Sequence, residues 1–343
     1  MLLLLFCSLL ILLLFLPFAP GLREMLNGKD AEPLFINMDY RRNPRYFGLS
    51  FRQIVIKSLA NYTGMSGFLH IKLSKQELIE VVDDAVVEDG GSVATIYYVE
   101  NNLQSGRNVR FEKEVYVRGN ACLGEGNELR ALACDGDIHI LGRTRFIRWL
   151  DAEGSIRAEE ESELGVSAAC GKELFLAGGC SFKRLYGFPV TTMTSTMAYT
   201  APERVAAGDF VEAGPASQQE DMQRNLAVLP ARSRKNCDII TAHSLTIGEH
   251  TIIEGHVKTH GDLVAAHSVT ITGNIFAGGN IRLGPYCRVL GTIFTQGHIT
   301  LEDGVAVGSH GKIKSVISKK GITFHRGVSV FGFVSTEGEG RVI

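Results

Sequence analysis

Histidine is the residue type in this sequence best suited to chemistry, and eight of its ten copies lie beyond residue 240. They include His250, His256, His260, His267 and His298. A histidine near neutral pH can act as the general base that deprotonates an acceptor hydroxyl or amine, as acyl transfer requires. No aspartate or glutamate stands at a fixed offset that would orient one of them. The pattern therefore favours imidazoles on the surface and at corners, and predicts no catalytic residue.

Metal and cofactor motifs are equally weak. His256 and His260 are four residues apart, a ligand spacing that needs a helix, whereas the surrounding residues form short β-type runs. The glycine pairs at 90–91, 178–179 and 278–279 lack the lysine and the strand-to-helix context of a phosphate-binding loop. We therefore expect turn glycines, no metal and no cofactor.

Composition narrows the class of protein. The 35 basic residues nearly balance the 37 acidic ones, so the charge does not point to a nucleic-acid partner. The seven cysteines form no C-x-x-C pair and are odd in number. Scattered cysteines of this kind indicate buried free thiols in a reducing compartment. The 38 glycines, without a matching excess of proline, indicate many tight corners within regular structure.

Those corners belong to a repeat in the C-terminal part of the chain. Short apolar rows begin at Leu245, Leu263, Ile281, Ile299 and Ile322; three steps are 18 residues and the fourth is 23, which leaves five extra residues. Alternation within each row predicts a strand with one face inward. Glycine followed two residues later by valine or isoleucine recurs and predicts a corner, because glycine can adopt positive φ. The predicted corner glycines are Gly255, Gly273, Gly291, Gly311 and Gly332, and the predicted core ladder is Val257, Ile275, Ile293, Ile313 and Val334.

Three short strands and three corners per 18 residues predict a parallel β-helix, an all-β solenoid. Successive coils would stack about 4.8 Å apart through backbone hydrogen bonds. Two known types of protein fit this spacing. One is the left-handed β-helix of hexapeptide acyltransferases, and the other is the right-handed β-helix of polymer-forming scaffolds. The spacing alone leaves the handedness open.

The N-terminus predicts a membrane anchor. Residues 1–19 contain no charged side chain, and ten of them are leucine. Nineteen helical residues span about 28 Å, close to the thickness of the hydrocarbon core of a bilayer. A cleaved signal peptide is the alternative, but the basic segment before the apolar run is missing and Pro20 makes a poor cleavage site. Basic residues follow the span, which favours a cytoplasmic body; they are Arg23, Lys29, Arg41, Arg42 and Arg45.

Four further segments follow the anchor. Residues 20–110 predict a mixed juxtamembrane segment, with strands at 51–57 and 92–99 and either a helix or a strand at 77–87. Residues 111–190 predict a first β-helical lobe, because rows at Ile138, Ile156 and Leu174 repeat every 18 residues. Residues 191–236, rich in Thr, Ser, Ala and Pro, predict a loop or linker. Residues 237–343 form the second predicted lobe.

The runs L-T-I-G-E-H-T-I-I-E-G-H-V-K-T from Leu245 and V-T-I-T-G-N-I-F-A-G from Val269 resemble the core of bactofilins, which are bacterial polymer-forming cytoskeletal proteins. The resemblance covers 237–340. It implies a right-handed β-helix that polymerises end to end without nucleotide and forms membrane-associated filaments or sheets that localise cell-envelope machinery. The chain departs from that family in its anchor helix, its additional lobe at 111–190 and its long insertion between the lobes.

We therefore expect a structural scaffold, not an enzyme, in the bacterial inner membrane. Its expected partners are further copies of itself, the membrane through residues 1–19 and unidentified cell-envelope proteins. An open solenoid end exposes unpaired backbone groups that can pair with another coil. Phe324, Phe331 and Phe333, in the last predicted row, are the candidate self-association residues. The alternative is a membrane-tethered hexapeptide-type acyltransferase acting on cell-envelope sugars.

Overall fold

The computed structural model describes Met1, Phe6 and residues 43–60, 69–73, 77–193 and 226–343. The chain divides into two compact units, Met1–Arg42 and Asn43–Ile343. The second unit is a right-handed β-solenoid of about 13 turns with about 18 residues per turn, so the predicted all-β solenoid is confirmed. The predicted membrane span at 1–19 lies outside the described residues, apart from Met1 and Phe6. Within the described ranges, no helix is both long enough and apolar enough to cross a membrane.

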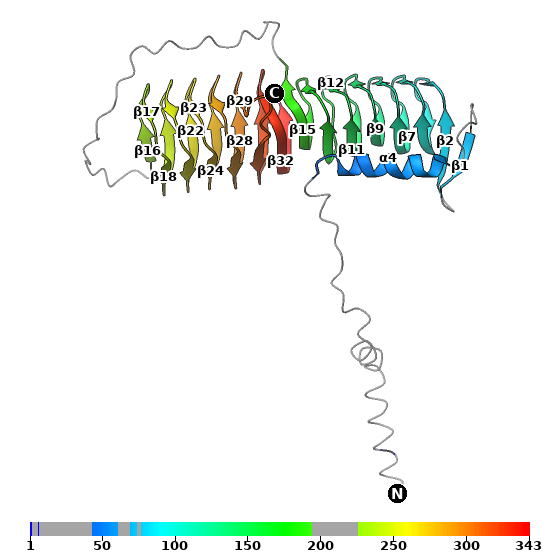
Figure 1. The fold of residues 1–343 in the computed structure, drawn as a ribbon, viewed down its shortest axis with the longest axis horizontal. Helices are drawn as coiled ribbons and strands as arrows, with labels where there is room; N and C mark the ends of the chain where they lie inside the picture. Colours follow the sequence, from blue (N-terminus) through cyan, green and yellow to red (C-terminus); the bar gives the residue numbers. More distant parts are fainter. Residues whose placement is uncertain (2–5, 7–42, 61–68, 74–76, 194–225) are drawn as a thin grey trace. The chain divides into compact units, whose positions relative to one another are not determined.

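The first lobe has three faces, in which strands of successive coils pair in parallel (Figure 1). Its face 1 contains β3 (Ala85–Val87), β6 (Leu103–Ser105), β8 (Ala121–Leu123), β10 (Ile138–Ile140), β12 (Ile156–Ala158) and β14 (Leu174–Leu176). Face 2 begins with β4 (Ser92–Val93), and face 3 contains β2 (Leu78–Val82), β5 (Ile96–Val99) and β13 (Ser167–Cys170). Longer strands bend from face 2 into face 3; they are β7 (Arg110–Val117), β9 (Glu128–Cys134), β11 (Arg145–Ala152) and β15 (Ser181–Thr192). A further strand, β1 (Leu69–Lys72), lies antiparallel to β2.

The second lobe repeats this plan with shorter strands. Face 1 contains β16 (Leu226–Leu229), β19 (Ser244–Ile247), β22 (Leu263–Ala265), β25 (Ile281–Leu283), β28 (His298–Leu301) and β31 (Gly321–Phe324). Face 2 contains β17 (Arg234–Lys235), β20 (Ile252–Ile253), β23 (Thr270–Ile271), β26 (Arg288–Val289) and β29 (Ala306–Val307). Face 3 contains β18 (Ile239–Thr241), β21 (Val257–Thr259), β24 (Ile275–Ala277), β27 (Ile293–Thr295) and β30 (Lys314–Ser318). The last strand, β32 (Ser329–Val342), contributes to all three faces.

The two lobes meet through their last coils. Strand β15 ends the first lobe and β32 ends the second, and the two pair antiparallel in three stretches separated by two register shifts. Register partners at this junction include Leu185 with Val334 and Tyr186 with Phe333. Because Leu185 and Val334 belong to face 3 of their lobes, the third face of the first lobe continues into the third face of the second. One hydrophobic core therefore runs through both lobes.

Helix α4 (Tyr46–Leu59) lies along face 3 of the first lobe (Figure 1). Its residues Phe51, Val55 and Leu59 are spaced four apart and pack on outward-facing side chains of the sheet, which include Tyr116 and Trp149. This is a correction to the sequence prediction, which assigned 51–57 to a strand. The β-branched residues of that stretch favour a strand, but tertiary packing of one apolar helical face overrides this local preference.

Corner glycines serve two purposes. At Gly273 and Gly291 a Cβ atom would lie 2.2 Å and 2.1 Å from the carbonyl oxygen of the glycine one coil earlier, so these positions need glycine for the close approach of stacked backbones. Their φ angles are not positive, contrary to the predicted reason, whereas the predicted corner glycines Gly311 and Gly332 do adopt positive φ, of 78° and 136°. Positive φ also recurs every 18 residues at a different corner, occupied by Arg232, His250, Ser268, Tyr286 and then Gly304.

The predicted core ladder is right at four positions and wrong at Ile313. Val257, Ile275 and Ile293 pair in register and are fully buried, as is Val334, but the partner of Ile293 is Val316. Ile313 is 57% exposed. The five extra residues of this coil precede β30 and form a turn there, which shifts the inward position by three residues. Gly311 is therefore not the equivalent of Gly291, and Lys314 occupies that column opposite Gly332.

The solenoid also extends further than predicted. Coils begin at β2 and β3, inside the predicted juxtamembrane segment 20–110, and continue without interruption into the segment predicted as 111–190. The stretch 92–99 contains β4 and β5, as predicted. The stretch 77–87, where helix and strand were left open, forms β2 and β3. The predicted linker 191–236 overlaps the end of β15 and the strands β16 and β17, so the second lobe begins at Leu226.

Candidate self-association site

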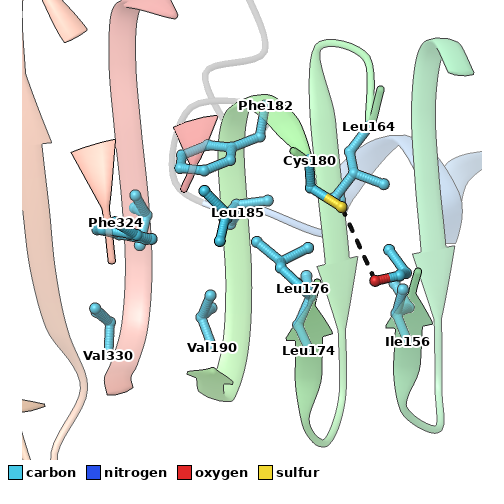
Figure 2. Close-up of a cluster of buried hydrophobic side chains, with 14 of the residues drawn as sticks. Ile156, Leu164, Leu174, Leu176, Cys180, Phe182, Leu185, Val190, Phe324 and Val330 are labelled. Atoms are coloured by element: carbon cyan, nitrogen blue, oxygen red, sulfur yellow. Dashed lines mark hydrogen bonds between the residues drawn. The ribbon is translucent and has the colours of Figure 1, made fainter. Parts of the chain in front are cut away.

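The three predicted self-association rings lie at the junction of the lobes. Phe324 is fully buried, and its ring packs against that of Phe182 with centroids 5.5 Å apart (Figure 2). Phe331 and Phe333 are half-buried on β32, and Phe333 is the register partner of Tyr186. The solenoid end that carries these rings is therefore covered by β15 of the same chain, and the prediction that they form an exposed docking surface is corrected.

Backbone hydrogen bonds close this junction on several corners. The amide of Gly179 donates to the Val342 oxygen at 2.9 Å, and the Val342 amide donates to the Cys180 oxygen at 3.0 Å. The Thr192 hydroxyl donates to the His325 backbone oxygen at 2.6 Å. The last coil of each lobe thus provides hydrogen-bond partners for the polar groups at the end of the other lobe, as neighbouring coils within one lobe do.

The first coil of the second lobe presents the opposite situation. We call this coil, made of β16, β17 and β18, the open coil end. Each of its strands pairs with one strand of the next coil, and within the described residues no strand pairs on the other side. Val228 and Ile240 on this coil are 63% and 73% exposed.

At alternate residues of the open coil end, the backbone amide and carbonyl groups point away from the next coil. The Ile239 amide donates to the His256 oxygen at 2.8 Å, and the Thr241 oxygen accepts from the His260 amide at 3.1 Å. The Leu229 oxygen likewise accepts from the Gly248 amide at 2.9 Å. Because successive residues of a strand direct their polar groups to opposite edges, the amides of Val228 and Ile240 face the open edge.

The far end of the first lobe is more covered. Strand β1 pairs antiparallel with β2 on face 3, with Leu69 opposite Val81 and Lys72 opposite Leu78. On faces 1 and 2, β3 and β4 each pair with the next coil. An antiparallel strand over an edge is a common way to block edge-to-edge pairing.

The histidines serve the corners of the second lobe. The His256 Nδ1 accepts a hydrogen bond from the Asn274 amide at 2.9 Å, while the His256 amide donates to Asp238 Oδ1 at 2.7 Å. Asn274 Oδ1 accepts from the Thr292 amide at 2.8 Å and continues this ladder. Side chains at this corner therefore hold successive coils together.

Other histidines stack or are partly buried. The rings of His250, His267 and Tyr286 stack in a row with centroids 5.4 Å and 5.5 Å apart. His298 contacts the Thr323 hydroxyl at 2.9 Å, and burial lowers its pKa. His260 is exposed at a corner. Among the described residues, no group of three His, Cys, Asp or Glu side chains could hold a metal ion.

A buried ionic cluster fixes α4 to the first lobe. The guanidinium of Arg52 contacts Asp151 and donates to Asp135 Oδ1 at 2.8 Å. Arg45 donates to Asp151 Oδ2 at 2.9 Å and to Glu153, and its hydrogen bond lowers the pKa of Glu153. The helix can approach β11 closely because residue 48 is glycine; a Cβ there would lie 2.4 Å from the Asp151 Cβ. In the first lobe, face 3 is thus covered by a helix that ion pairs hold in place.

A groove of about 510 Å³ crosses face 1 of the first lobe over β6, β8, β10 and β12. Its rim residues Asn102, Asn120 and Asp137 each accept, through a side-chain oxygen, the backbone amide of the residue one coil later. Cys122 and His139 point outward from register-paired positions on its floor. The rim oxygens are therefore engaged in stacking the coils.

Comparison with known proteins found no matching family model, no matching curated protein and no matching solved structure.

Proposed function

We propose that this protein is a membrane-anchored structural scaffold that self-associates through the ends of its β-solenoid into filaments or patches that organise cell-envelope machinery. Residues 1–19 anchor it in a bacterial inner membrane, and the solenoid lies in the cytoplasm. The observation that carries the proposal is the open coil end, where three strands carry a row of outward-directed backbone groups.

The open coil end has the chemistry of a pairing surface. Edge strands that present unpaired amides and carbonyls are templates for another chain unless they are blocked by proline, charge or a covering element. Val228 and Ile240 have exposed aliphatic side chains on this edge. Ala227, Leu229 and Ile239 are partly buried side chains that pack against the core at this end, so a second copy would complete their burial.

The junction within the chain shows the geometry that such a contact would take. Strands β15 and β32 close coil against coil in antiparallel register, with aromatic packing of Phe182 on Phe324 beneath. Two copies meeting through β16–β18 would form the same kind of antiparallel contact around a two-fold axis. Growth beyond two copies would use the edges of β3 and β4 at the other end.

The test compares edge-blocking and edge-preserving variants of the full-length protein in detergent. Val228→Pro with Ile240→Pro removes the two outward-facing amides and leaves the bonds to the next coil in place. Val228→Thr with Ile240→Thr is the matched control, since it keeps both amides and suits a strand. Light scattering and negative-stain electron microscopy measure the assembly.

The wild type and the threonine pair should form assemblies larger than two copies at micromolar concentration. The proline pair, whose β3 and β4 edges stay open, should form no assembly larger than two copies. A wild type that stays a single copy, or a proline pair that assembles equally well, would overturn the proposal. For topology, a phosphatase fused after Ile343 should be inactive; an active fusion would place the solenoid outside the cytoplasm.

A further inference from the structure

Face 3 of the second lobe carries an outward apolar stripe that continues the surface covered by α4 in the first lobe. We define the face-3 stripe as Ile240, Phe276, Phe294 and Ile317. Lys258 stands between Ile240 and Phe276, and all five residues pair in register from coil to coil. Ile240 is 73% and Phe276 41% exposed, while Phe294 and Ile317 are half-buried. The rings of Phe276 and Phe294 lie 6.3 Å apart.

The register extends this column into the first lobe. Ile317 pairs with Ser335, and Ser335 pairs with Arg184 across the lobe junction. Further along face 3, the outward-facing residues are Trp149 and its register partner Ala131, which are buried under α4. Helix α4 therefore covers this surface in the first lobe. In the second lobe the same surface consists of apolar side chains, and no element among the described residues covers it.

We propose that the face-3 stripe docks an amphipathic helix of a partner protein, about 14 residues long, apolar on one face and acidic on its flanks. The length follows from the stacking. The stripe covers four coil steps, about 19 Å at roughly 4.8 Å per step. A helix of 14 residues, the length of α4, is about 21 Å long.

Charge sets the sign of the partner. Where α4 docks, the helix supplies the cations Arg45 and Arg52, and the sheet supplies the carboxylates of Asp135 and Asp151. In the column of the face-3 stripe and along β30 the sheet instead supplies cations, while the carboxylates of Asp238 and Asp262 at the flanking corners accept backbone amides. The cations are Lys258 within the stripe and, at the two ends of β30, Lys314, Lys319 and Lys320. A helix with glutamate or aspartate along its flanks complements them, as α4 complements its own face.

Area argues against a second copy as the occupant. Two such stripes placed face to face would each bury about 200 Å², from a length of about 19 Å and the width of a three-residue strand, roughly 10 Å. A stable interface between two proteins buries about 800 Å² on each side. A helix that inserts a few anchors into a groove needs less surface and binds through side chains at i, i+3 or i+4 and i+7.

The probe for this site is a 14-residue peptide with the sequence of α4 carrying R52E, Q53E and K57E, stapled through its polar face to hold the helix. The native α4 peptide, stapled in the same way, is the charge control. Binding to the full-length protein is measured by fluorescence anisotropy. We expect the acidic peptide to bind in the micromolar range and the native peptide at least tenfold more weakly.

Variants of the protein locate the site. Phe294→Asp should abolish binding of the acidic peptide, and Lys258→Glu should weaken it about tenfold. Val264→Asp, an outward substitution at a 40% exposed position on face 1, should leave binding unchanged. Circular dichroism identifies any variant that unfolds, in which case Phe276→Ser replaces Phe294→Asp.

Three results would overturn the proposal. They are no binding of the acidic peptide, equal binding to the folded Phe294→Asp protein, and a smaller assembly size of Phe294→Asp in light scattering, which would make the stripe a contact between copies. Because Val228 lies on face 1 of the open coil end and outside the face-3 stripe, the single variant Val228→Pro should assemble less than the wild type and still bind the peptide. Failure of the self-association proposal is therefore distinguishable from failure of this one.

Discussion

The ring of Phe182 on β15 packs against the ring of Phe324 on β31, with centroids 5.5 Å apart and planes inclined by 35°. These residues are 142 positions apart in the sequence and belong to different lobes. Both are at least 98% buried. The contact joins two stacks of coils, each held together by local repetition, into one core.

Phe182→Ala should lower the free energy of unfolding by about 3–5 kcal/mol, because it removes a buried ring and leaves a cavity at the junction. We also expect urea unfolding to change from one transition to two, since the lobes would lose the aromatic contact that joins them. Phe324→Ala should behave alike, and the double-mutant cycle should give a coupling of about 0.5–1.5 kcal/mol.

Phe175→Ala is the control for that series. Phe175 is half-buried and points outward on face 1 beneath the guanidinium of Arg157, 4.4 Å from its ring centroid. Its removal should cost less than about 1 kcal/mol and keep a single transition. An equal loss at Phe175 and Phe182 would contradict a special role for the junction.

Val316→Asp and Ile313→Asp form a matched pair across the five-residue insertion. Val316 is fully buried in the inward column, whereas Ile313 is 57% exposed. A carboxylate at 316 would be buried without a partner, so we expect the loss of at least about 3 kcal/mol or failure to fold. The change at 313 should stay within about 0.5 kcal/mol. Thermal unfolding monitored by circular dichroism measures both; a reversed order would restore the register predicted from the sequence.

The sequence period predicts most of the second lobe because each coil must bury the same positions. It fails at Ile313 because two aliphatic residues three apart fit one column equally well, and the position of the turn decides between them. The period is weaker in the N-terminal coils, because their rows contain few glycine signatures. One signal was present: Gly90, Asn108 and Gly126 are 18 residues apart and all adopt positive φ.

The site was less predictable than the fold. Aromatic residues in the last row lead to the prediction of a contact with another copy, whereas β15 of the same chain covers that end. No local pattern specifies this cover. Helix α4 was missed because its stability depends on distant partners such as Asp151, 99 residues from Arg52. Pairing between segments this far apart leaves no periodic trace in a single sequence.

Cysteine alkylation tests the burial of the core chemically. Burial raises the pKa of the Cys134 and Cys170 thiols to about 12, and that of Cys180 and Cys287 to about 11. The thiolate is the reactive form, so these four thiols should resist iodoacetamide at pH 8 in the native protein. Cys237, which is exposed, should react first.

Mass spectrometry of peptides from native and urea-treated protein measures the alkylation of each cysteine. Cys122, with intermediate exposure, should react more slowly than Cys237 and faster than the buried thiols. All six cysteines in the described part of the chain should react in urea. Native labelling of Cys134 or Cys287 at the rate of Cys237 would mean that the coils open far more often than a continuous core allows.

The pairing of Arg45 with Glu153 should make part of the stability depend on pH. The hydrogen bond from Arg45 lowers the folded-state pKa of Glu153, while the unfolded chain has the ordinary value of about 4.3. The unfolded state therefore binds a proton more readily, so this stabilisation is fully present above about pH 4.3 and is lost as the pH falls through the folded-state pKa. Because the Glu153 side chain is 43% exposed, solvent screening limits the effect to less than about 1 kcal/mol.

Urea unfolding of the wild type and of Glu153→Gln at several pH values measures this. The variant should be less stable by a constant amount between pH 6 and 8, and the difference should shrink below about pH 4.3. In an Arg45→Gln background the Glu153→Gln change should have no pH-dependent effect, because the donor that lowers the Glu153 pKa is gone. A difference that persists unchanged to pH 3, or survives without Arg45, would show that Glu153 stabilises α4 by some means other than this charge pair.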